Sequence, residues 1–360
     1  MMRLEQGRIS SIQLVMLIIG YIFGTSLILN PGRMAGHDAW LTVLAGLTEG
    51  LIFVFIITAL GTRFKGKNLI EINDLIFGSY LGKVVSLVYL WYFLHLANMV
   101  LRSYGDFFTD TIYPETPLIV FILLLALVCA FAVRNGIEVI VRCSLILVPL
   151  TIFFIIADTL LLLKDMKLTN FLPLFDAPWS EFLGASHGAA TFPFGETVAL
   201  LMVFVFVQDR QKVRARTLQA VVIAGLFLCV IVARNTAVLG ITATVQTYPS
   251  FLAIRLIDIA KVLTRLEIIV MTSFLVMGFL KVAVLYYGTV VGLAQLFKLG
   301  SYLPLVFPVG IIMVTLSVFS FASSLELINF AYEKYPYYSL PFQVGLPLLS
   351  LIVASLRDVS

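Results

Sequence analysis

Long apolar runs recur along the chain, separated by short polar stretches. A membrane-spanning helix needs about 17 to 25 mainly apolar residues. Ten runs meet this need, near residues 12–30, 40–62, 84–108, 117–133, 141–163, 185–207, 217–242, 265–296, 302–322 and 339–356. The pattern therefore predicts an all-α integral membrane protein with ten transmembrane helices.

The composition of the chain agrees with this pattern. Hydrophobic residues make up 61% and charged residues 12%, whereas soluble domains have roughly 45–50% and 25%. The first run follows a head with Arg3 and Arg8, and no small-residue cleavage site precedes the next run, so we expect a retained first span. The three cysteines have neither metal-ligand nor disulfide spacing, and we interpret them as small core residues. They are Cys129, Cys143 and Cys229.

The lysines and arginines in the connections predict the orientation, because cytoplasmic loops carry an excess of them. One side collects Arg3, Arg8, Arg63, Lys65, Lys67, Lys83, Arg134, Arg142, Arg210, Lys212, Arg214, Arg216, Lys298 and Arg357. The other side collects Arg33, Lys164, Lys167, Arg255, Lys261, Arg265 and Lys334. Fourteen residues against seven place both termini in the cytoplasm. The net charge of +4 gives no indication of a nucleic-acid partner.

Ten spans can divide into two halves of five. Because five is odd, the second half of such a repeat is inserted upside down, as in many secondary transporters. We expect a single transmembrane domain over residues 1–360, with a first repeat at about 10–164 and a second at about 180–357. Span one then corresponds to span six.

Both of these corresponding spans carry helix-breaking residues at membrane depth. Span one reads GYIFGTSLILNPG at 20–32, with Gly24 inside it and Pro31 at its end. Span six contains ATFPFGETVAL at 190–200, with Pro193 and Gly195. Irregular backbone is tolerated in a bilayer only where it is buried in protein or lines a cavity. Two such breaks predict a central binding site; the alternative is that Gly24 serves helix packing and Pro193 makes an ordinary kink.

Two motifs in these spans resemble those of a known family. They are GTSLILNPGRMAGHDAW at 24–40 and FPFGE at 192–196, set in a ten-span chain. They are similar to the B subunits of endospore germinant receptors, the GerAB-type germination permeases. FPFGE in the sixth span and a Gly-Asp-Ala-Trp type of entry into the second span are features of that family. Here His37-Asp38-Ala39-Trp40 follows Gly36.

The resemblance implies both a fold and a role. That family belongs to the amino acid, polyamine and organocation transporter superfamily, which implies the five-plus-five inverted repeat, LeuT-like, with broken helices 1 and 6. It also implies a small-molecule germinant such as an amino acid, partner A and lipoprotein C subunits, and a place in the inner membrane of the spore.

The residues around the two breaks form the predicted ligand site. Glu196 follows the break in span six, where the positive end of a half-helix favours a carboxylate; it can hold a ligand ammonium, receive a proton or lock the unwound segment. Backbone N–H groups after the break in span one suit a ligand carboxylate, and unwound carbonyls in span six suit its ammonium. The N–H groups belong to Gly24, Thr25 and Ser26, the carbonyls to Ala189, Ala190 and Thr191, and pocket-lining rings to Phe192 and Phe194.

Lys281 lies near the middle of the eighth span, too deep to reach either membrane surface easily. In sodium-coupled members of the wider superfamily, spans one and eight jointly hold a sodium ion, so Lys281 resembles a fixed cation in its place. The alternatives are a structural salt bridge to Glu196, Glu49 or Asp158, and a water-solvated position in a cavity. The candidates for ion or proton coupling are Lys281, Glu196 and Glu49, and the sequence predicts no metal site or cofactor.

Other charges within the spans have local interpretations. Arg102 and Asp106 lie four residues apart on one helix face, which predicts a local pair. Arg234 either lines an outward vestibule or pairs with Glu49.

No motif in the sequence indicates an enzyme, since nucleophile–base spacing, a phosphate-binding loop and a nucleotide fingerprint are all missing. The three histidines have no metal-ligand spacing, and loop or packing roles are favoured over a pH switch. They are His37, His95 and His187. Three functions remain: a nutrient-sensing receptor subunit, a proton-coupled amino acid symporter, and an ion or water pathway opened by a germinant. The family resemblance favours the first.

Overall fold

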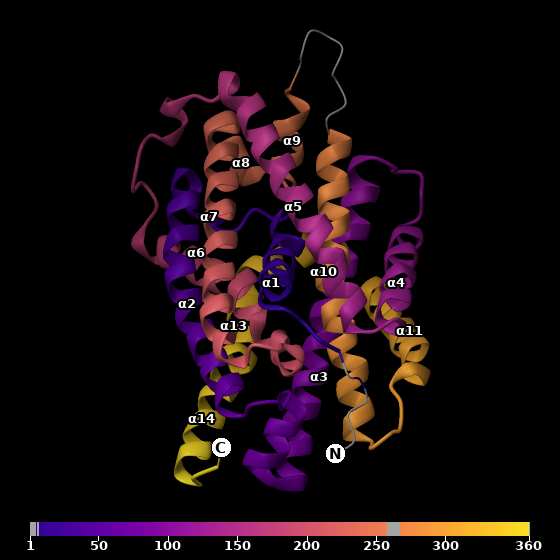
Figure 1. Cartoon of the computed structure of the whole chain (residues 1–360). Helices are drawn as coiled ribbons and strands as arrows, with labels where there is room; N and C mark the ends of the chain where they lie inside the picture. Colours follow the sequence, from indigo (N-terminus) through magenta and orange to yellow (C-terminus); the bar gives the residue numbers. More distant parts are fainter. Residues whose placement is uncertain (1–4, 6, 258–266, 360) are drawn as a thin grey trace.

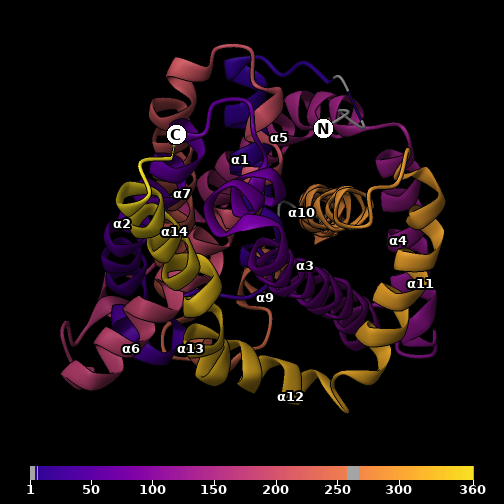
Figure 2. The same cartoon turned by 90° about the horizontal axis from the view of Figure 1, so that it is seen from below.

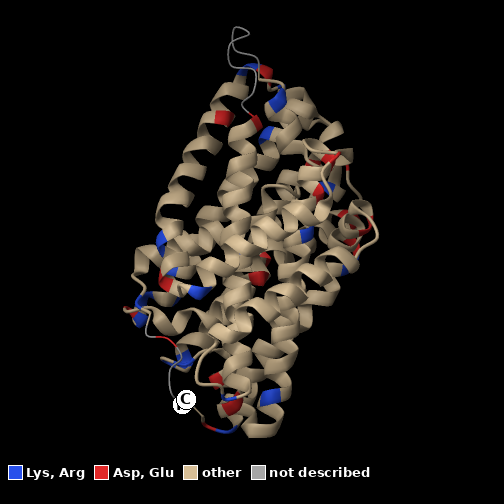
Figure 3. Ribbon diagram, turned by 90° about the vertical axis from the view of Figure 1, so that its right-hand side faces the viewer, with Lys and Arg blue, Asp and Glu red and all other residues tan. Residues whose placement is uncertain are grey.

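The computed structural model describes residues 5, 7–257 and 267–359, which are mainly helical. The long helices run roughly along one direction, and α14 (Leu346–Leu356) lies at the same end as the first described residues (Figure 1). Charged residues gather towards the two ends of the bundle, and few lie in its middle (Figure 3). Three residues used to predict the orientation, Arg3, Lys261 and Arg265, lie outside the described residues.

The predicted spans coincide with helical stretches. Spans one to five are α1 (Ser11–Ser26), α2 (Ala39–Arg63), α3 (Leu69–Thr111), α4 (Leu118–Arg134) and α5 (Ile137–Leu161). Span six begins with α6 (Trp179–Ala189), and spans seven to nine are α7 (Val213–Leu239), α10 (Glu267–Leu296) and α11 (Leu303–Phe319). The short helices α8 (Thr242–Val245) and α9 (Pro249–Arg255) lie between spans seven and eight. Six stretches of the described chain are long and apolar enough to cross a membrane, and α1, α4 and α11 are shorter apolar helices.

The tenth span is longer than its apolar run predicts. It extends over Ser324–Leu356 rather than 339–356. In order it consists of α12 (Ser324–Asn329), the π-helical segment Phe330–Lys334, α13 (Tyr335–Leu340), a second π-helical segment Pro341–Gly345, and α14. The first half contains FAYEKYPYYS, whose tyrosines and charges interrupt the apolar pattern.

Capping boxes mark the starts of two long helices. Ser10 accepts a hydrogen bond from the Gln13 backbone N–H in a capping box before α1, and Asn68 does the same with Glu71 before α3. Within α3, Gly78 has φ 81° and ψ 174°, a conformation that glycine adopts at little cost. This kink separates a short first part of α3 from the membrane span that follows it.

Two pairs of helices that the predicted repeat makes equivalent are in contact. Under that scheme α2 corresponds to α7 and α3 to α10, and each pair packs together. Helix α1 packs against α5, α7 and α10, and Figure 2 shows α1, α3 and α10 with the other helices around them. The limits of the two repeats, about 10–164 and 180–357, stay a prediction.

The N-terminal segment packs against the far end of span six. The Ile9 N–H donates to the Phe206 carbonyl at 2.9 Å, and the Gln208 N–H donates to the Ile9 carbonyl at 3.0 Å. Glu5 accepts hydrogen bonds from the Ile137 N–H at 2.8 Å and the Tyr287 hydroxyl at 2.7 Å. These contacts join the N-terminal segment to spans five, six and eight at the end where α1 begins.

Candidate functional site

Span six is broken where the sequence predicts it. Helix α6 ends at Ala189, and a π-helical segment follows at Ala190–Phe194. Phe192 has φ −125° and ψ 108°, outside the helical region, and its bond to Pro193 is cis. The chain then continues as a 3-10 helix at Gly195–Met202, with Glu196 in its first turn.

Span one is interrupted several residues later than predicted. Gly24, Thr25 and Ser26 form the last turn of α1 rather than the start of a second half-helix. The irregular backbone lies at 27–32, where Gly32 has φ 77°. The N–H groups of the last α1 turn therefore point back along their own helix, so the predicted cradle for a ligand carboxylate is not formed there.

A buried ion pair lies between the two interrupted spans. Lys281 Nζ of α10 forms a salt bridge with Glu196 Oε2, and both side chains are 0% exposed. Lys281 Nζ also donates to Thr25 Oγ1 at 3.1 Å, and it lies 5.6 Å and 5.1 Å from the ring centres of Tyr21 and Phe192. Two full charges can stay in such a dry place because each neutralises the other and both have hydrogen-bond partners.

The other carboxylate oxygen of Glu196 is held by the tenth span. The Tyr335 hydroxyl donates to Glu196 Oε1 at 2.7 Å and lies 2.9 Å from the Tyr92 hydroxyl. Gln343 Nε2 donates to the Tyr92 hydroxyl and to the Thr191 carbonyl, both at 2.9 Å. A continuous set of hydrogen bonds thus joins the carboxylate to α3 and to span ten.

Two glycines make room for this arrangement. A methyl group on Gly24 would overlap the Lys281 side chain, and one on Gly195 would overlap the Gln343 side chain. The stem of Lys281 therefore crosses α1 at Gly24, which allows the ammonium to reach Glu196. Here Gly24 is helical and serves close packing.

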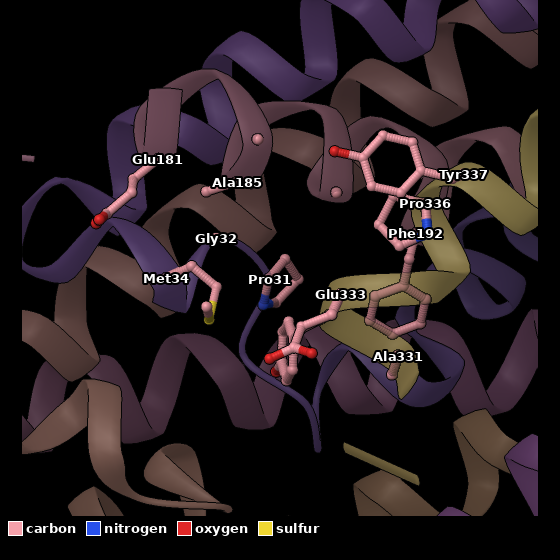
Figure 4. A pocket seen from close by; sticks show the side chains of 13 residues that line it. Pro31, Gly32, Met34, Glu181, Ala185, Phe192, Ala331, Glu333, Pro336 and Tyr337 are labelled. Atoms are coloured by element: carbon pink, nitrogen blue, oxygen red, sulfur yellow. The ribbon is translucent and has the colours of Figure 1, made fainter. Parts of the chain in front are cut away.

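An open pocket leads from the protein surface to the break in span six. Its volume is about 280 Å³. It is lined by Pro31, Gly32, Met34, Glu181, Gly184, Ala185, Gly188, Phe192, Ala331, Tyr332, Glu333, Pro336 and Tyr337. These residues lie in the connection after span one, in α6 at the start of span six and in the first half of span ten, so the pocket is on the side away from both termini. We call it the outer pocket (Figure 4).

A second, much smaller cavity of about 20 Å³ lies beside the ion pair. We call it the inner chamber; it is lined by Thr25, Leu29, Leu96, Met99, Val100, Ser103, Phe192, Glu196, Leu327, Ala331 and Tyr335. Phe192 and Ala331 line both cavities, and Figure 4 shows them near each other at one side of the outer pocket. These two residues therefore separate the outer pocket from Glu196.

The structure brings together only part of the predicted ligand site. Gly24, Thr25, Phe192, Glu196 and Lys281 meet around the ion pair. The other predicted positions pack elsewhere or already have partners. Ala189, Ala190 and Phe194 pack against glycines of α2, the Ser26 hydroxyl donates to the Ile22 carbonyl, and the Thr191 carbonyl is taken by Gln343. Phe194 lines neither cavity.

Glu49 lies apart from the ion pair. Its Oε1 is 2.7 Å from His187 Nδ1, and both side chains are partly exposed. The proposed pairings of Glu49 with Lys281 and with Arg234 are therefore wrong. Lys281 binds Glu196, as in the predicted alternative of a salt bridge, and the interpretation of Lys281 as a fixed cation in place of sodium stays a prediction.

Two other predicted charge positions are now located. Arg102 Nε lies 2.8 Å from Asp106 Oδ1, which confirms the local pair. Arg234 donates to the Thr159 hydroxyl at 3.5 Å and shares a cavity of about 20 Å³ with Asp158. Both residues are buried, and this cavity is separate from the inner chamber.

The motif at the entry to α2 fixes the connection before span six. Asp38 is fully buried and accepts hydrogen bonds from the Phe175 N–H at 2.9 Å and the Ala177 N–H at 3.4 Å. His37 Nδ1 lies 2.8 Å from the Asn170 carbonyl, and Trp40 packs edge-on against Phe171. The histidine thus has the loop role expected of it, and the motif holds the chain that leads into α6.

Sequence reasoning missed the uncharged members of the site. Tyr21, Tyr92, Tyr335 and Gln343 are buried, and the Tyr21 hydroxyl donates to the Glu196 carbonyl at 3.0 Å. A signal was present for one of them, because YPYYS at 335–339 places three tyrosines beside an apolar run. Polar side chains in a membrane span need partners, and this cluster belonged to a span that was predicted too short.

Comparison with solved structures shows the fold. A nucleobase-cation-symport-1 family transporter, Mhp1, in a closed conformation with bromovinylhydantoin bound, matches 96% of this chain and 78% of its own, with a TM-score of 0.71 and 15% identity. MhsT in complex with L-phenylalanine matches 99% of this chain and 93% of its own, with a TM-score of 0.64 and 15% identity. Both are LeuT-fold transporters, and this chain has the same fold.

Comparison of sequences shows the family. The family model described as Spore germination protein matches residues 8–324. Spore germination protein KB of Bacillus subtilis is 32% identical over 98% of this chain and 95% of its own length. Spore germination protein YndE of the same species is 20% identical over 81% of this chain and 82% of its own. The chain is thus a multi-pass membrane protein that belongs to the spore germination permease family.

Proposed function

We propose that this chain is the nutrient-sensing membrane subunit of a spore germinant receptor. A small germinant, of the size of an amino acid, enters the outer pocket and binds between spans one and six. The resulting conformational change passes to partner A and C subunits in the spore inner membrane. Both termini face the cytoplasm, so the outer pocket opens on the opposite side of that membrane.

The observation that carries this proposal is the position of the outer pocket. Its volume of about 280 Å³ is close to the lower end of the range of roughly 300–1,000 Å³ for small-molecule sites. It stops at Phe192, and Glu196 lies in the inner chamber on the other side of that ring. A ligand that displaces Phe192 therefore gains access to a buried charged site in the middle of the fold.

The hydrogen bond from Tyr335 supports a signalling role. A ligand can shift a conformational equilibrium only through its different affinities for the two states. A ligand that occupies Glu196 competes with Tyr335 for the carboxylate. Release of Tyr335 frees the first half of span ten, which two π-helical segments divide into short pieces. Span ten is the route by which occupancy of the site reaches the surface.

A second candidate function is proton-coupled transport of the same ligand. The supporting observation is the fully buried pair of Glu196 and Lys281, because ionisable groups within a membrane span mark proton and ion pathways. Alternating access would then expose this pair first to the outer pocket and afterwards to the other side. An ion or water pathway opened by the ligand would use the same cavities.

Binding and uptake measurements separate these functions. Purified full-length protein in lipid nanodiscs is screened by thermal shift against a panel of amino acids, sugars and nucleosides. Each compound that binds is tested for uptake into proteoliposomes with and without a proton gradient. Binding without uptake supports the sensor, whereas gradient-driven uptake supports the symporter. If none of the compounds binds, the receptor proposal fails.

A pair of variants locates the binding site in the same assay. Glu196→Gln removes the buried charge and should weaken binding of any compound that stabilises the wild type. Asp209→Asn removes a carboxylate that pairs with Lys212 near the protein surface, so it serves as the matched control. Equal binding by Glu196→Gln and wild type would remove Glu196 from the site.

A further inference from the structure

The ion pair between Glu196 and Lys281 can be a structural contact, and it also has the charges that a ligand with one positive and one negative group would need. Each member has its own neutral partner besides the opposite charge: Thr25 for Lys281, and Tyr335 for Glu196. Both partners lie on elements other than those that carry the two charges. If the pair separated, each charged group would keep one hydrogen bond while it accepted a new opposite charge.

We propose that Glu196 and Lys281 receive the ammonium and the carboxylate of a zwitterionic α-amino acid, which inserts between them and replaces their direct contact. This inference rests on the proposed function, because it assumes that a small ligand binds at this site. The ligand carboxylate pairs with Lys281, and the ligand ammonium pairs with Glu196. The predicted cradle of N–H groups at the end of α1 is then not required.

Charge balance selects this class of ligand. The pair is buried at 0% exposure, so a change in the net charge of the site carries a large desolvation cost. A zwitterion brings one positive and one negative charge and leaves the site neutral. An amine without a carboxylate, or an acid without an ammonium, satisfies one member of the pair and leaves the other buried without a partner. An uncharged ligand such as a sugar separates the two charges and compensates neither.

The surrounding side chains define the rest of the ligand. The inner chamber has apolar walls at Leu29, Met99 and Val100, which suit an aliphatic side chain. Its volume of about 20 Å³ is smaller than any amino acid, so the ligand reaches the pair only when Phe192 moves. Phe192 lies at the break in span six, where its φ and ψ angles are outside the helical region.

The outer pocket favours the same ligand. Glu181 and Glu333 contribute carboxylates to its lining, and none of the residues that line it is a lysine or an arginine. Arg33 is nearby, with its guanidinium 4.4 Å from the ring centre of Tyr332, which does line the pocket. An approaching ammonium group thus meets carboxylates before it reaches Glu196.

The test compares ligands that differ only in charge. Glycine, alanine, valine and leucine are titrated into the nanodisc protein, each beside its amide, which lacks the carboxylate, and its N-acetyl form, which lacks the ammonium. Glucose and inosine represent uncharged ligands. We expect at least one free amino acid to bind and both of its derivatives to bind at least about 30-fold more weakly, as for the loss of one partner from a buried charge pair.

Single variants of the pair should differ in which of the two derivatives, the amide or the N-acetyl form, they bind more tightly. Glu196→Gln leaves Lys281 as the only charge, so the N-acetyl form should bind more tightly than the amide. Lys281→Met leaves Glu196, so the amide should bind more tightly than the N-acetyl form. Asp106→Asn disrupts another buried pair, which lines neither cavity, and should keep the wild-type preference. Size-exclusion profiles and thermal stability show which variants are folded.

Where a single variant does not fold, the double variant Glu196→Gln with Lys281→Met removes both charges together and should lose the preference for the zwitterion. Equal affinities for an amino acid and its two derivatives in the wild type would overturn the inference. So would an unchanged preference in the folded single or double variants. Binding of glucose or inosine without any amino acid would refute the zwitterion inference and leave the receptor function standing. If no compound binds, both proposals fail.

Discussion

Replacement of Gly24 by alanine tests whether the close approach of α1 and α10 holds the buried pair in place. An added methyl group would lie 2.8 Å from Lys281 Cβ and would overlap Lys281 Cδ. Optimal contacts between carbon atoms are about 3.5–4.0 Å. The lysine stem cannot swing away easily, because its Cβ is fixed to α10 and its ammonium is held by Glu196 and Thr25.

The expected loss of stability follows from these contacts. If the helices separate slightly, the cost is that of overpacking a core, about 1–3 kcal/mol. If the lysine leaves Glu196 instead, a buried charge loses its partner and the cost rises to about 3–5 kcal/mol. Gly24→Ala should therefore have a free energy of unfolding in mixed micelles that is lower by at least about 1 kcal/mol than that of a glycine-to-alanine change at a helical position with open space.

Gly184→Ala is the matched control for this measurement. Gly184 is also helical, but no atom lies within 4 Å of its added methyl group. Alanine is favoured over glycine in a helix by about 1 kcal/mol, so this variant should be as stable as the wild type or more stable. If Gly24→Ala and Gly184→Ala gave the same free energy of unfolding, the proposed close contact would be refuted.

A double-mutant cycle identifies the partner of Gly24. Lys281→Ala removes Cγ and Cδ, so Gly24→Ala should cost less in that background than in the wild type. Residues in contact usually show coupling energies of about 0.5–3 kcal/mol. Additive costs would show that the methyl group strains some other contact.

Three more predictions concern the contacts around the site and at the two ends of the protein. Tyr335→Phe removes the donor to Glu196 Oε1 and should lower the free energy of unfolding by about 1.5–3 kcal/mol, as for a hydrogen bond to a charged group; an unchanged value would show that Glu196 does not depend on span ten. Arg63→Met removes hydrogen bonds to the Val359 and Ala354 carbonyls and to the Ser355 hydroxyl, so amide hydrogen exchange at 354–359 should become faster, while unchanged exchange would mean that other contacts hold the end of α14. Asp38→Ala removes the acceptor for the Phe175 and Ala177 N–H groups, so exchange at these two amides should become faster, and equal protection in the variant would contradict the role given to the motif.

The membrane spans and the break in span six could be predicted from the sequence because their signals are local. Apolar runs of sufficient length mark the spans, and Pro193 with the polar Glu196 interrupts one of them. The hydropathy pattern loses this accuracy in span ten, where Tyr335 is 2% exposed and faces other helices while Tyr337 is 68% exposed. A side chain that faces other helices instead of lipid does not need to be apolar when it has a hydrogen-bond partner.

The break in span one was misplaced because a glycine has two different uses. Gly24 provides space for the Lys281 stem within a regular helix. Gly32 provides a positive φ of 77° where the helix has ended. Both are single glycines in an apolar stretch. Only the packing of α10 against α1 distinguishes them, and the contact residue Lys281 is far from both in the sequence.

The charged residues of the site are easier to predict from the sequence than their uncharged hydrogen-bond partners. Glu196 and Lys281 stand out in the sequence because charges within apolar spans are rare. Tyr335 does not, since it is 139 residues from Glu196 and its role depends on how span ten crosses span six. Thr25, Glu196, Lys281 and Tyr335 come from four different spans, so a ligand that separates the pair changes contacts in spans one, six, eight and ten together. Under the proposed function, this convergence is the physical reason why ligand binding at the pair would bias the packing of four spans at once.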